Sequence, residues 1–372
     1  MRIAFYAPMK PPTHPVPSGD RRVARLLMQA LRAGGHEIIL ASRLRAWSAG
    51  DDPNRMRRIR QRGERTARRL IDRWRDDPGR PQAWFTYHLY HKAPDWIGPQ
   101  VARALDIPYL VAEASHAPKQ ATGPWAEGFQ AAEQALRQAC AVFALSADDE
   151  AGLRRALGGD APIQRLPPFL DARPYIRASA QREKARRTCL PEPAEGPWLL
   201  AVGMMRAGDK QASYDVLADA LKRLAERPWH LAVVGFGPAA DAILAKFDAT
   251  RTRHFGKLKP AELADLYAAS DLFVWPAINE AFGMALLEAQ AAGLPVVAGG
   301  GRGVPDIVDD GRTGLLKPTG DVQAFAGAVA DLLDDPHRRR EMGAAAQQYV
   351  LAHHDLGAAA ARLNAALRDA TA

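Results

Sequence analysis

The stretch DLFVWPAINEAFGMALLEAQAAGLPVVAGG, residues 271–300, decides the class of fold. It opens with an apolar run of strand length, 271–276, and continues through a loop into a helical pattern from Phe282 to Ala292. It closes on a second apolar run, PVVAG. A strand, a helix and a strand in this order place the two strands parallel in one sheet, with the helix across one face. The stretch therefore predicts an α/β protein.

The same alternation continues on both sides of this stretch. Strands are predicted at WLLAVG and HLAVVG, and helices at Tyr214–Glu226, Ala239–Lys246 and Gln323–Leu333. The first half repeats the pattern, with RIAFYA a predicted strand, Asp20–Ala33 a helix and HEIILAS the next strand. Doubly wound domains of this kind bind ligands at the carboxyl ends of their strands. We therefore expect two doubly wound, Rossmann-like domains that face each other across a cleft.

The length of 372 residues is too great for one ordinary core and suits two domains. Polar, proline-rich residues make 181–197 the best linker, which gives a first domain at 1–180 and a second at 198–350. The segment 351–372 is rich in alanine, and we expect it to form a helix that crosses back to the first domain.

The composition excludes several classes of protein. The chain is 47% hydrophobic and 25% charged, as globular proteins are, which excludes a wholly disordered chain. Its two cysteines, Cys140 and Cys189, are too few for a disulfide framework or a four-cysteine zinc site. The sequence contains neither an apolar run of about 18 residues nor a secretory apolar region at its start. We expect a cytoplasmic protein, with the inner face of the membrane as a further location.

Positive charge is concentrated in one stretch. Residues 43–80 hold thirteen arginines, no lysine and six acidic residues, so seven of the chain's eight net positive charges lie there. Apolar residues recur every three or four positions from Met56 to Trp74, and the arginines lie largely off this stripe, as in a basic amphipathic helix. Residues 55–75 are therefore a candidate for peripheral contact with an anionic membrane or a phosphorylated partner. The alternative is a helix that packs its stripe on its own domain and leaves its arginines in solvent. No zinc-finger spacing or aromatic-interleaved motif points to nucleic acid.

The loop and helix start within 271–300 carry the strongest chemical signal. Phe282 and Gly283 open the predicted helix, whose first amides, with the positive end of the helix dipole behind them, form a site for a diphosphate. Glu280, just ahead, can accept hydrogen bonds from hydroxyls of a group attached to that phosphate, and Glu288 can do so for a ribose. The alternative is that Glu280 only favours the helix dipole and that Glu288 is a solvated helix residue.

Loops after two other predicted strands add cations and glycines. In VGMMRAGDK, Arg206 and Lys210 would neutralise a diphosphate; the alternative is two exposed loop cations. Gly235 and Gly237 follow HLAVVG in a G-x-G-x-x-A arrangement that is typical of dinucleotide-binding loops. The next predicted strand, RHFG, lacks the acidic residue that would hold the ribose of NAD, so these glycines favour a phosphate or sugar. A glycine-dense segment, residues 299–318, is predicted as a loop.

Together these motifs resemble family-four retaining glycosyltransferases with the GT-B fold. The matching stretches are VG followed by Lys210, then VVGFGP, YAASDLFVWP, NEAFGMALLEAQAAGLPVV and GVPDIVDDGRTGLL, within about residues 197–318. Glu280 and Glu288 stand at the E-x7-E spacing of that family. The first half resembles the family's acceptor domain more loosely, through RIAFYA, Ser18-Gly19 ahead of a helix, and GHEI.

The resemblance implies a role for each matching residue. Glu280 would contact hydroxyls of the donor sugar, Glu288 the donor ribose, and Lys210 the diphosphate. The other implied donor-binding residues are Phe282, Gly283, Met284, Gly203, Gly235 and Gly237, and the implied acceptor-side phosphate loop is Ser18 and Gly19.

Two departures from the family affect catalytic residues. The family usually has arginine directly after the glycine of its VGR motif; here Met204 stands there, and Arg206 takes this role only if the loop is rearranged. The family's first-domain histidine should follow the predicted strand PYLVAEAS. His116 comes about two residues late, so it is the first candidate, while His88 and His91 remain open.

The resemblance implies that a sugar moves from a UDP-, GDP- or ADP-sugar to the hydroxyl of a glycan or lipid-linked acceptor, with retention of the anomeric configuration. In the family's mechanism the acceptor attacks on the face that the diphosphate leaves, and the diphosphate takes the acceptor proton. Lys210, Arg206 and helix amides would stabilise the charge, and no metal or other cofactor is expected because the sequence lacks an Asp-x-Asp motif. The alternatives are a catalytically silent GT-B module that binds sugars or partners, and a sugar-nucleotide epimerase.

Overall fold

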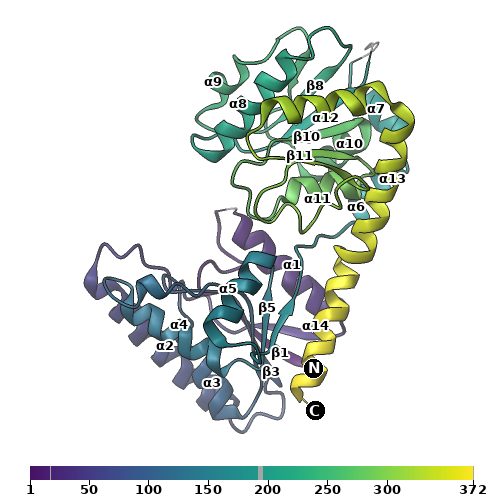
Figure 1. The fold of residues 1–372 in the computed structure, drawn as a ribbon. Helices are drawn as coiled ribbons and strands as arrows, with labels where there is room; N and C mark the ends of the chain where they lie inside the picture. The colour runs from purple at the N-terminus through teal and green to yellow at the C-terminus, as the bar shows by residue number, and fades with distance from the viewer. Residues whose placement is uncertain (17, 192–195, 372) are drawn as a thin grey trace. The chain divides into compact units, whose positions relative to one another are not determined.

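The computed structural model describes residues 1–16, 18–191 and 196–371 and divides the chain into two compact units (Figure 1). Unit 1 holds Met1–Pro167 together with Leu356–Ala372, and unit 2 holds Pro168–Asp355. Each unit is built on one six-stranded sheet in which every paired strand is parallel. Both units therefore have the doubly wound α/β architecture that the sequence predicts.

The sheet of unit 1 has the strand order β2-β1-β3-β4-β5-β6. Its strands are β1 (Arg2–Tyr6), β2 (Glu37–Leu40), β3 (Ala83–Leu89), β4 (Tyr109–Ala114), β5 (Ala141–Ala144) and β6 (Ile163–Arg165). Its helices are α1 (Gly19–Ala33), α2 (Pro53–Trp74), α3 (Gly98–Leu105), the 3-10 turn η1 (Pro118–Gln120), α4 (Ala126–Gln138), α5 (Ala147–Leu157) and α14 (Leu356–Thr371). The strand order reverses between β1 and β3, so the switch point, where ligands bind in such sheets, lies at their carboxyl ends.

The last helix of the chain completes unit 1. α14 packs against α1, and Asn364 joins the two ends of the sequence (Figure 1). Its Nδ2 donates to the Gly34 carbonyl oxygen at 3.0 Å, and its Oδ1 lies 2.7 Å from His36 Nε2. α14 begins at Leu356 rather than at residue 351, because α13 (Pro336–His353) ends just before it.

The apolar stripe of α2 is buried inside unit 1. Ala67 and Trp74 belong to a buried cluster that α2, α3, α4 and α5 form on one face of the sheet, and Ile59 is buried as well. Gly63 faces Trp96 so closely that a Cβ atom at residue 63 would lie 2.4 Å from Trp96 Cβ. The stripe is therefore not available to a membrane, and α2 presents its arginine side to solvent.

The sheet of unit 2 has the strand order β12-β11-β10-β7-β8-β9. Its strands are β7 (Trp198–Val202), β8 (His230–Val234), β9 (Thr252–His254), β10 (Leu272–Trp275), β11 (Val296–Gly299) and β12 (Gly314–Lys317). Its helices, besides α13, are α6 (Arg173–Ser179), α7 (Arg182–Cys189), α8 (Asp209–Lys222), α9 (Ala240–Leu244), α10 (Pro260–Ala269), α11 (Met284–Ala291) and α12 (Val322–Asp334). The segment 299–318, predicted as a loop, contributes the edge strand β12.

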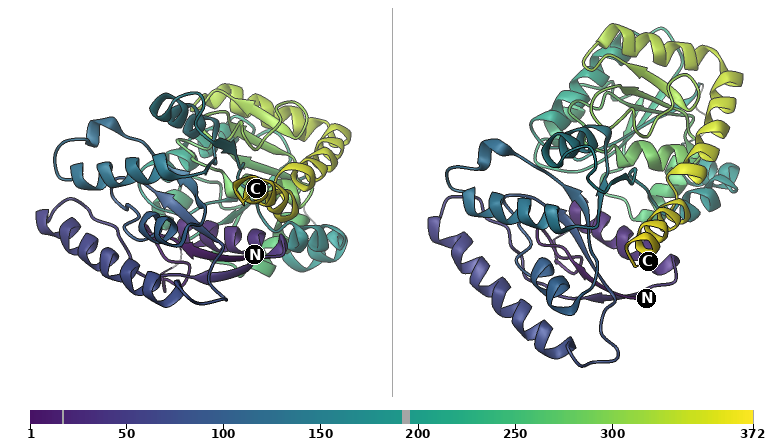
Figure 2. Two further views of the ribbon diagram at one scale, coloured as in Figure 1. Left: turned by 90° about the horizontal axis from the view of Figure 1, so that it is seen from below. Right: turned by 60° about the horizontal axis from the view of Figure 1, so that its bottom comes forward.

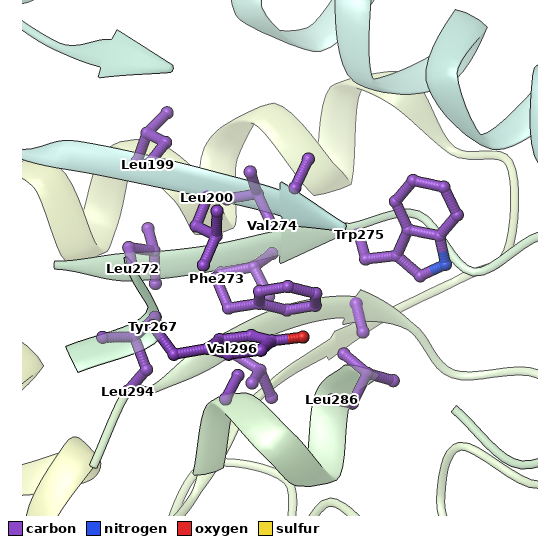
Figure 3. Close-up of a cluster of buried hydrophobic side chains, with 14 of the residues drawn as sticks. Leu199, Leu200, Tyr267, Leu272, Phe273, Val274, Trp275, Leu286, Leu294 and Val296 are labelled. Atoms are coloured by element: carbon purple, nitrogen blue, oxygen red, sulfur yellow. The ribbon is translucent and has the colours of Figure 1, made fainter. Parts of the chain in front are cut away.

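Figure 3 shows the core of unit 2 around the central strands. Leu200 of β7 and Phe273 of β10 come from paired strands and are fully buried. The hydroxyl of Tyr267 points toward the helix that carries Leu286, which is α11. Trp275 lies at the carboxyl end of β10, so its indole reaches the edge of the core where the candidate site begins.

The boundary between the units lies at Pro167, ahead of the expected linker 181–197. The reason is a partly buried ion-pair cluster in unit 2. Arg182 of α7 lies 2.7 Å from Asp271 Oδ1, and Arg186 lies 2.9 Å from Asp271 Oδ2, which also accepts from the Trp198 amide at 2.8 Å. α7 therefore belongs to unit 2, and residues 192–195 of the expected linker lie outside the described residues.

Candidate functional site

The candidate donor site lies at the switch point of the unit 2 sheet. β7 and β10 are neighbours there, and the strand order continues from them in opposite directions, so the loops that leave their carboxyl ends emerge side by side. The loop after β7 leads into α8, and the loop after β10 leads into α11. Three residues predicted for the donor site, Gly203, Arg206 and Glu280, lie on these two loops, and Lys210 follows the first of them.

Lys210 and Glu280 meet at this switch point. α8 begins at Asp209 rather than at the predicted Tyr214, which places Lys210 in its first turn. Lys210 Nζ forms an ion pair with Glu280 Oε2, and the indole Nε1 of Trp275 donates to the same oxygen at 3.3 Å. The two charged side chains are only 23% and 18% exposed, and Lys210 Nζ also lies 5.3 Å from the Trp275 ring centroid. A cation and a carboxylate thus lie together, partly buried, against an aromatic ring.

The loop that carries Glu280 is held in an uncommon backbone conformation. Ala277 has φ 55° and Asn279 has φ 53°, a left-handed region that costs a side-chain-bearing residue on the order of 1–3 kcal/mol. Its hydrogen bonds run to both neighbouring segments: the Ile278 amide donates to Ser213 Oγ at 3.0 Å, Asn279 Nδ2 donates to Asp209 Oδ2 at 2.9 Å, and Arg302 donates to Asn279 Oδ1 at 2.8 Å. The position of the Glu280 carboxylate is therefore fixed by contacts from the start of α8 and from the loop after β11.

Sequence reasoning missed the residues that hold this loop. The sequence assigned no role to these residues, which are Asp209, Ser213, Arg302 and Trp275. Asp209 and Ser213 stand i and i+4 on one side of α8, and the Ser213 hydroxyl also donates to the Asp209 carbonyl oxygen at 2.9 Å. The sequence offers one signal for two of them. Asp209 and Ser213 are polar residues on either side of Lys210, ahead of the helix predicted from Tyr214.

The predicted donor-binding glycines lie where backbones approach each other closely. A Cβ atom at Gly203 would lie 2.7 Å from the Trp275 ring, one at Gly235 would lie 1.9 Å from the Gly203 carbonyl oxygen, and one at Gly237 would lie 2.1 Å from the Met205 carbonyl oxygen. These glycines therefore let the loops after β7 and β8 pack together. Binding of a phosphate by these two loops stays a prediction.

We expect Gly235→Ala to destabilise unit 2 by about 1–3 kcal/mol, because the added methyl group must displace the backbone of Gly203. Chemical denaturation monitored by tryptophan fluorescence measures this loss. Gly327→Ala is the matched control, since Gly327 lies within α12 with nothing within 4 Å of an added Cβ atom, and alanine is the better helix former there. Equal stability of the two variants would contradict the close-packing role.

α11 begins at Met284, two residues after the predicted start at Phe282. Gly283, at φ 62°, is the residue before the helix, and no side chain among the described residues caps α11. A Cβ atom at Gly283 would lie 2.8 Å from Leu286 Cδ1. Both this close contact and the left-handed backbone conformation therefore favour glycine at this position. The amides of Met284 and Ala285 are therefore available to an anion, whereas that of Leu286 donates to the Gly283 carbonyl oxygen at 2.8 Å. The side chains of Phe282 and Met284 are half-buried beside them.

The two glutamates of the E-x7-E pair lie in different surroundings. Glu280 turns to Lys210 rather than capping α11. Glu288 is 3% exposed and accepts a hydrogen bond from the Tyr267 hydroxyl at 3.0 Å, so the alternative of a solvated helix residue is wrong. Arg206 is exposed, and the buried side chain of this loop is Met205.

A second group of titratable side chains lies at the switch point of the unit 1 sheet. His88 of β3 and Glu113 of β4 stand opposite each other in the register of the two strands, with φ 63° and 57°. His88 Nδ1 lies 3.1 Å from Asp20 Oδ1 in the first turn of α1 and 3.5 Å from Glu113 Oε1. Among the described residues, the hydrogen bond of the His88 ring is made through Nδ1 and none is made through Nε2. The imidazole is thus oriented by two carboxylates while its second nitrogen remains free for a ligand.

The charges in this group shift one another's pKa values. Burial alone would lower the pKa of His88, but the carboxylates of Glu113 and Asp20 outweigh it, and the pKa is raised. The hydrogen bond from His88 lowers the pKa of Asp20, whereas burial raises that of Glu113. Asp149 of α5 acts on His88 and Glu113 with a further negative charge, and Lys10 acts on Asp20.

The other two candidate histidines have different surroundings. His116 packs on Phe129 at 5.0 Å between ring centroids, and its Nε2 lies 3.6 Å from Glu133. His91 packs edge-on against Trp125, and burial lowers its pKa. Of the predicted phosphate-loop residues, Ser18 caps α1 by accepting from the Arg21 amide at 3.2 Å, and Gly19 is the first residue of α1.

The pairing of His88 with Asp20 and Glu113 was missed from the sequence. Glu113 carries the clearest signal, because it is a charged residue inside the apolar strand PYLVAEAS. Among the residues that the structure describes, no group of three metal-ligating side chains is placed to hold an ion. Within the same residues, no helix is both long enough and apolar enough to span a bilayer.

Comparison with known proteins finds a family match within unit 2. Residues 196–335 match the model of the family described as glycosyl transferases group 1. A D-inositol 3-phosphate glycosyltransferase of Corynebacterium diphtheriae is 33% identical over 198 residues, 50% of this chain and 46% of that protein. A GDP-mannose-dependent alpha-(1-6)-phosphatidylinositol monomannoside mannosyltransferase of Mycolicibacterium smegmatis is 33% identical over 209 residues, 53% of either protein. The chain spans about half the length of these two curated relatives.

Solved structures match the chain over nearly its whole length. A glycosyltransferase from Rickettsia africae superposes with a TM-score of 0.74 at 15% identity, covering 100% of this chain and 98% of that one. Sucrose-phosphate synthase from Thermosynechococcus elongatus gives 0.71 at 23% identity, covering 99% and 98%. Anabaena HepE in complex with UDP gives 0.69 at 16% identity, covering 99% and 100%. These likenesses confirm the predicted fold, two Rossmann-like domains of the GT-B type.

Proposed function

We propose that this chain, whose residues 196–335 match the group 1 glycosyl transferases and whose fold is of the GT-B type, is a glycosyltransferase that takes its sugar from a nucleoside diphosphate sugar. The observation that carries the proposal is the Lys210–Glu280 pair at the switch point of unit 2. It sets a cation for the diphosphate beside a carboxylate for sugar hydroxyls, within the matched segment.

The donor site follows from the groups that surround this pair. An incoming diphosphate would take Lys210 from Glu280 and accept hydrogen bonds from the first amides of α11. The released carboxylate of Glu280, still held by Trp275, would then accept hydrogen bonds from hydroxyls of the donor sugar. Glu288 would hold the donor ribose, with Tyr267 orienting its carboxylate. That HepE is solved with UDP and with UDP-glucose supports a nucleotide sugar as donor.

We further propose that transfer retains the anomeric configuration. The bond between the anomeric carbon and the diphosphate oxygen breaks, the acceptor oxygen bonds to the same face of that carbon, and the acceptor proton passes to the leaving phosphate oxygen. Lys210 and the α11 amides stabilise the negative charge that builds on the diphosphate. Arg206 is exposed on the preceding loop and would have to move to join them.

We propose that unit 1 binds the acceptor at the switch point of its sheet, where His88 presents Nε2 to an acceptor hydroxyl. The orientation of this imidazole by Asp20 and Glu113 makes it the best placed of the three candidate histidines. The relatives are named for an inositol phosphate and for a phosphatidylinositol mannoside, which supports a polyol or a lipid-linked glycan as acceptor.

The donor proposal is tested by thermal unfolding in the presence of UDP, GDP, ADP and their sugars. We expect one nucleotide to raise the melting temperature by about 5–10 °C at a hundred times its Kd, because it binds only the folded chain. The same series with Lys210→Met is the control for the site. A chain that no nucleotide stabilises would contradict a donor site and would favour a catalytically silent module.

A further inference from the structure

The solvent side of α2 is lined with arginines along its whole length. α2 has 22 residues, which makes it about 33 Å long. We call this side the arginine face; its exposed members are Arg55, Arg57, Arg58, Arg62, Arg65, Arg68, Arg69 and Arg73. One exposed acidic residue of α2, Asp72, interrupts it. The helix runs along the outer surface of unit 1, as the blue-violet ribbon of Figure 2 shows.

Most of these guanidinium groups have no ionic partner within unit 1. Arg58 pairs with Asp52 ahead of the helix, and Arg60, at the border of the face, pairs with Glu64 and Glu127. Among the described residues, no carboxylate lies within ion-pair distance of the side chains of the other members; these are Arg55, Arg57, Arg62, Arg65, Arg68, Arg69 and Arg73. A row of unpaired like charges repels itself, so the face is built for an external anion rather than for the stability of α2.

The geometry of the face fits an extended, flat anion. Arg58, Arg62, Arg65, Arg69 and Arg73 follow one another at steps of three or four, so they form one row along a regular helix. Arginine matches phosphodiester oxygens with two parallel hydrogen bonds, and lysine, which cannot do this, is absent from α2. A lipid bilayer presents such phosphates in a plane.

Two further observations indicate which class of anionic partner the arginine face binds. The apolar stripe of α2 is buried against Trp96 and its neighbours, so contact would be electrostatic, without insertion of the helix into the hydrocarbon. No exposed residue of α2 is aromatic, so the face lacks the stacking groups that proteins use for single-stranded nucleic acid. We propose that the arginine face of α2 docks unit 1 onto an anionic lipid bilayer through the lipid phosphates.

The test is flotation of the full chain with phosphatidylcholine vesicles that contain or lack phosphatidylglycerol. We expect binding only to the anionic vesicles and its loss in 1 M salt, where the screening length is about 3 Å. Each arginine near such a surface contributes a factor of about five to binding. The triple variant Arg58→Glu, Arg62→Glu and Arg69→Glu should therefore weaken binding at least about 100-fold.

The control triple variant, Arg223→Glu, Arg338→Glu and Arg340→Glu, makes the same change in charge at exposed positions of unit 2. We expect it to bind like the unmodified chain, and circular dichroism checks that both variants fold. Equal loss in both triples would show a response to net charge alone and would overturn the proposal. So would binding to neutral vesicles, absence of binding to either kind, or preferential binding of duplex DNA added in competition. The assay needs no donor or acceptor, so its outcome is independent of the proposed transferase activity.

Discussion

Glu280→Gln is expected to lower the rate of sugar transfer steeply while tightening the binding of the free nucleoside diphosphate. Transfer should fall by about 10²–10³-fold or more, because the amide cannot replace the carboxylate that holds the donor sugar. Binding of the diphosphate should tighten about fivefold, since Lys210 no longer has to leave an ion pair to reach the phosphates. Calorimetric titration with the nucleotide and a radiolabelled transfer assay measure the two effects separately.

Lys210→Met should change nucleotide binding in the opposite direction. It removes the cation and leaves Glu280 in place, so we expect binding of the diphosphate to weaken by about tenfold or more. Glu226→Gln is the matched control for Glu280→Gln, because Glu226 is an exposed carboxylate of the same unit. We expect it to change neither the transfer rate nor the nucleotide affinity. Normal turnover in Glu280→Gln would refute the assignment of the site. An unchanged nucleotide affinity would refute the exchange of partners by Lys210.

His88→Asn is expected to lower transfer by about 10²-fold or more and to leave the nucleotide-induced rise in melting temperature unchanged. Asparagine tolerates the left-handed backbone at φ 63° and can still donate to Asp20, so the substitution removes Nε2 with little effect on the fold. The same substitution at His116 and at His91 provides the comparison, and we expect both variants to keep most of the activity.

The pH profile distinguishes a role in transfer from a structural one. The carboxylates of Glu113 and Asp20 raise the pKa of His88, so Asp20→Asn should lower it. The limb of the rate profile that reports this histidine should then move to lower pH. A profile that stays in place in Asp20→Asn, or full activity in His88→Asn, would exclude His88 from the acceptor site.

Those features of the fold and the site that depend on a local pattern of residues could be predicted from the sequence. The strand–helix–strand unit at 271–300 predicted the parallel sheet, because the pattern of apolar residues identifies each element. The meeting of Lys210 with Glu280 was foreseeable as well. Lys210 follows β7 and Glu280 follows β10, and these strands are neighbours at the switch point.

Other features depend on contacts that no local pattern reveals. The preference for His88 over His116 rests on the register that sets His88 opposite Glu113, and register between two strands is a tertiary property. The boundary at Pro167 depends on two arginines of α7 that share Asp271 with the amide of Trp198. The glycines after β7 and β8 match a phosphate-binding motif, whereas their conformation is dictated by the approach of two backbones.

The division of unit 1 between the two ends of the chain has a consequence for biosynthesis. Translation proceeds from the amino terminus, so residues 1–167 leave the ribosome without the helix that packs on α1. All of unit 2 is translated before α14 supplies Asn364 to the turn at Gly34. Until then the side of α1 that α14 covers in the finished protein is exposed and is a candidate for chaperone contact. The second unit in the sequence is thus the first that can finish folding.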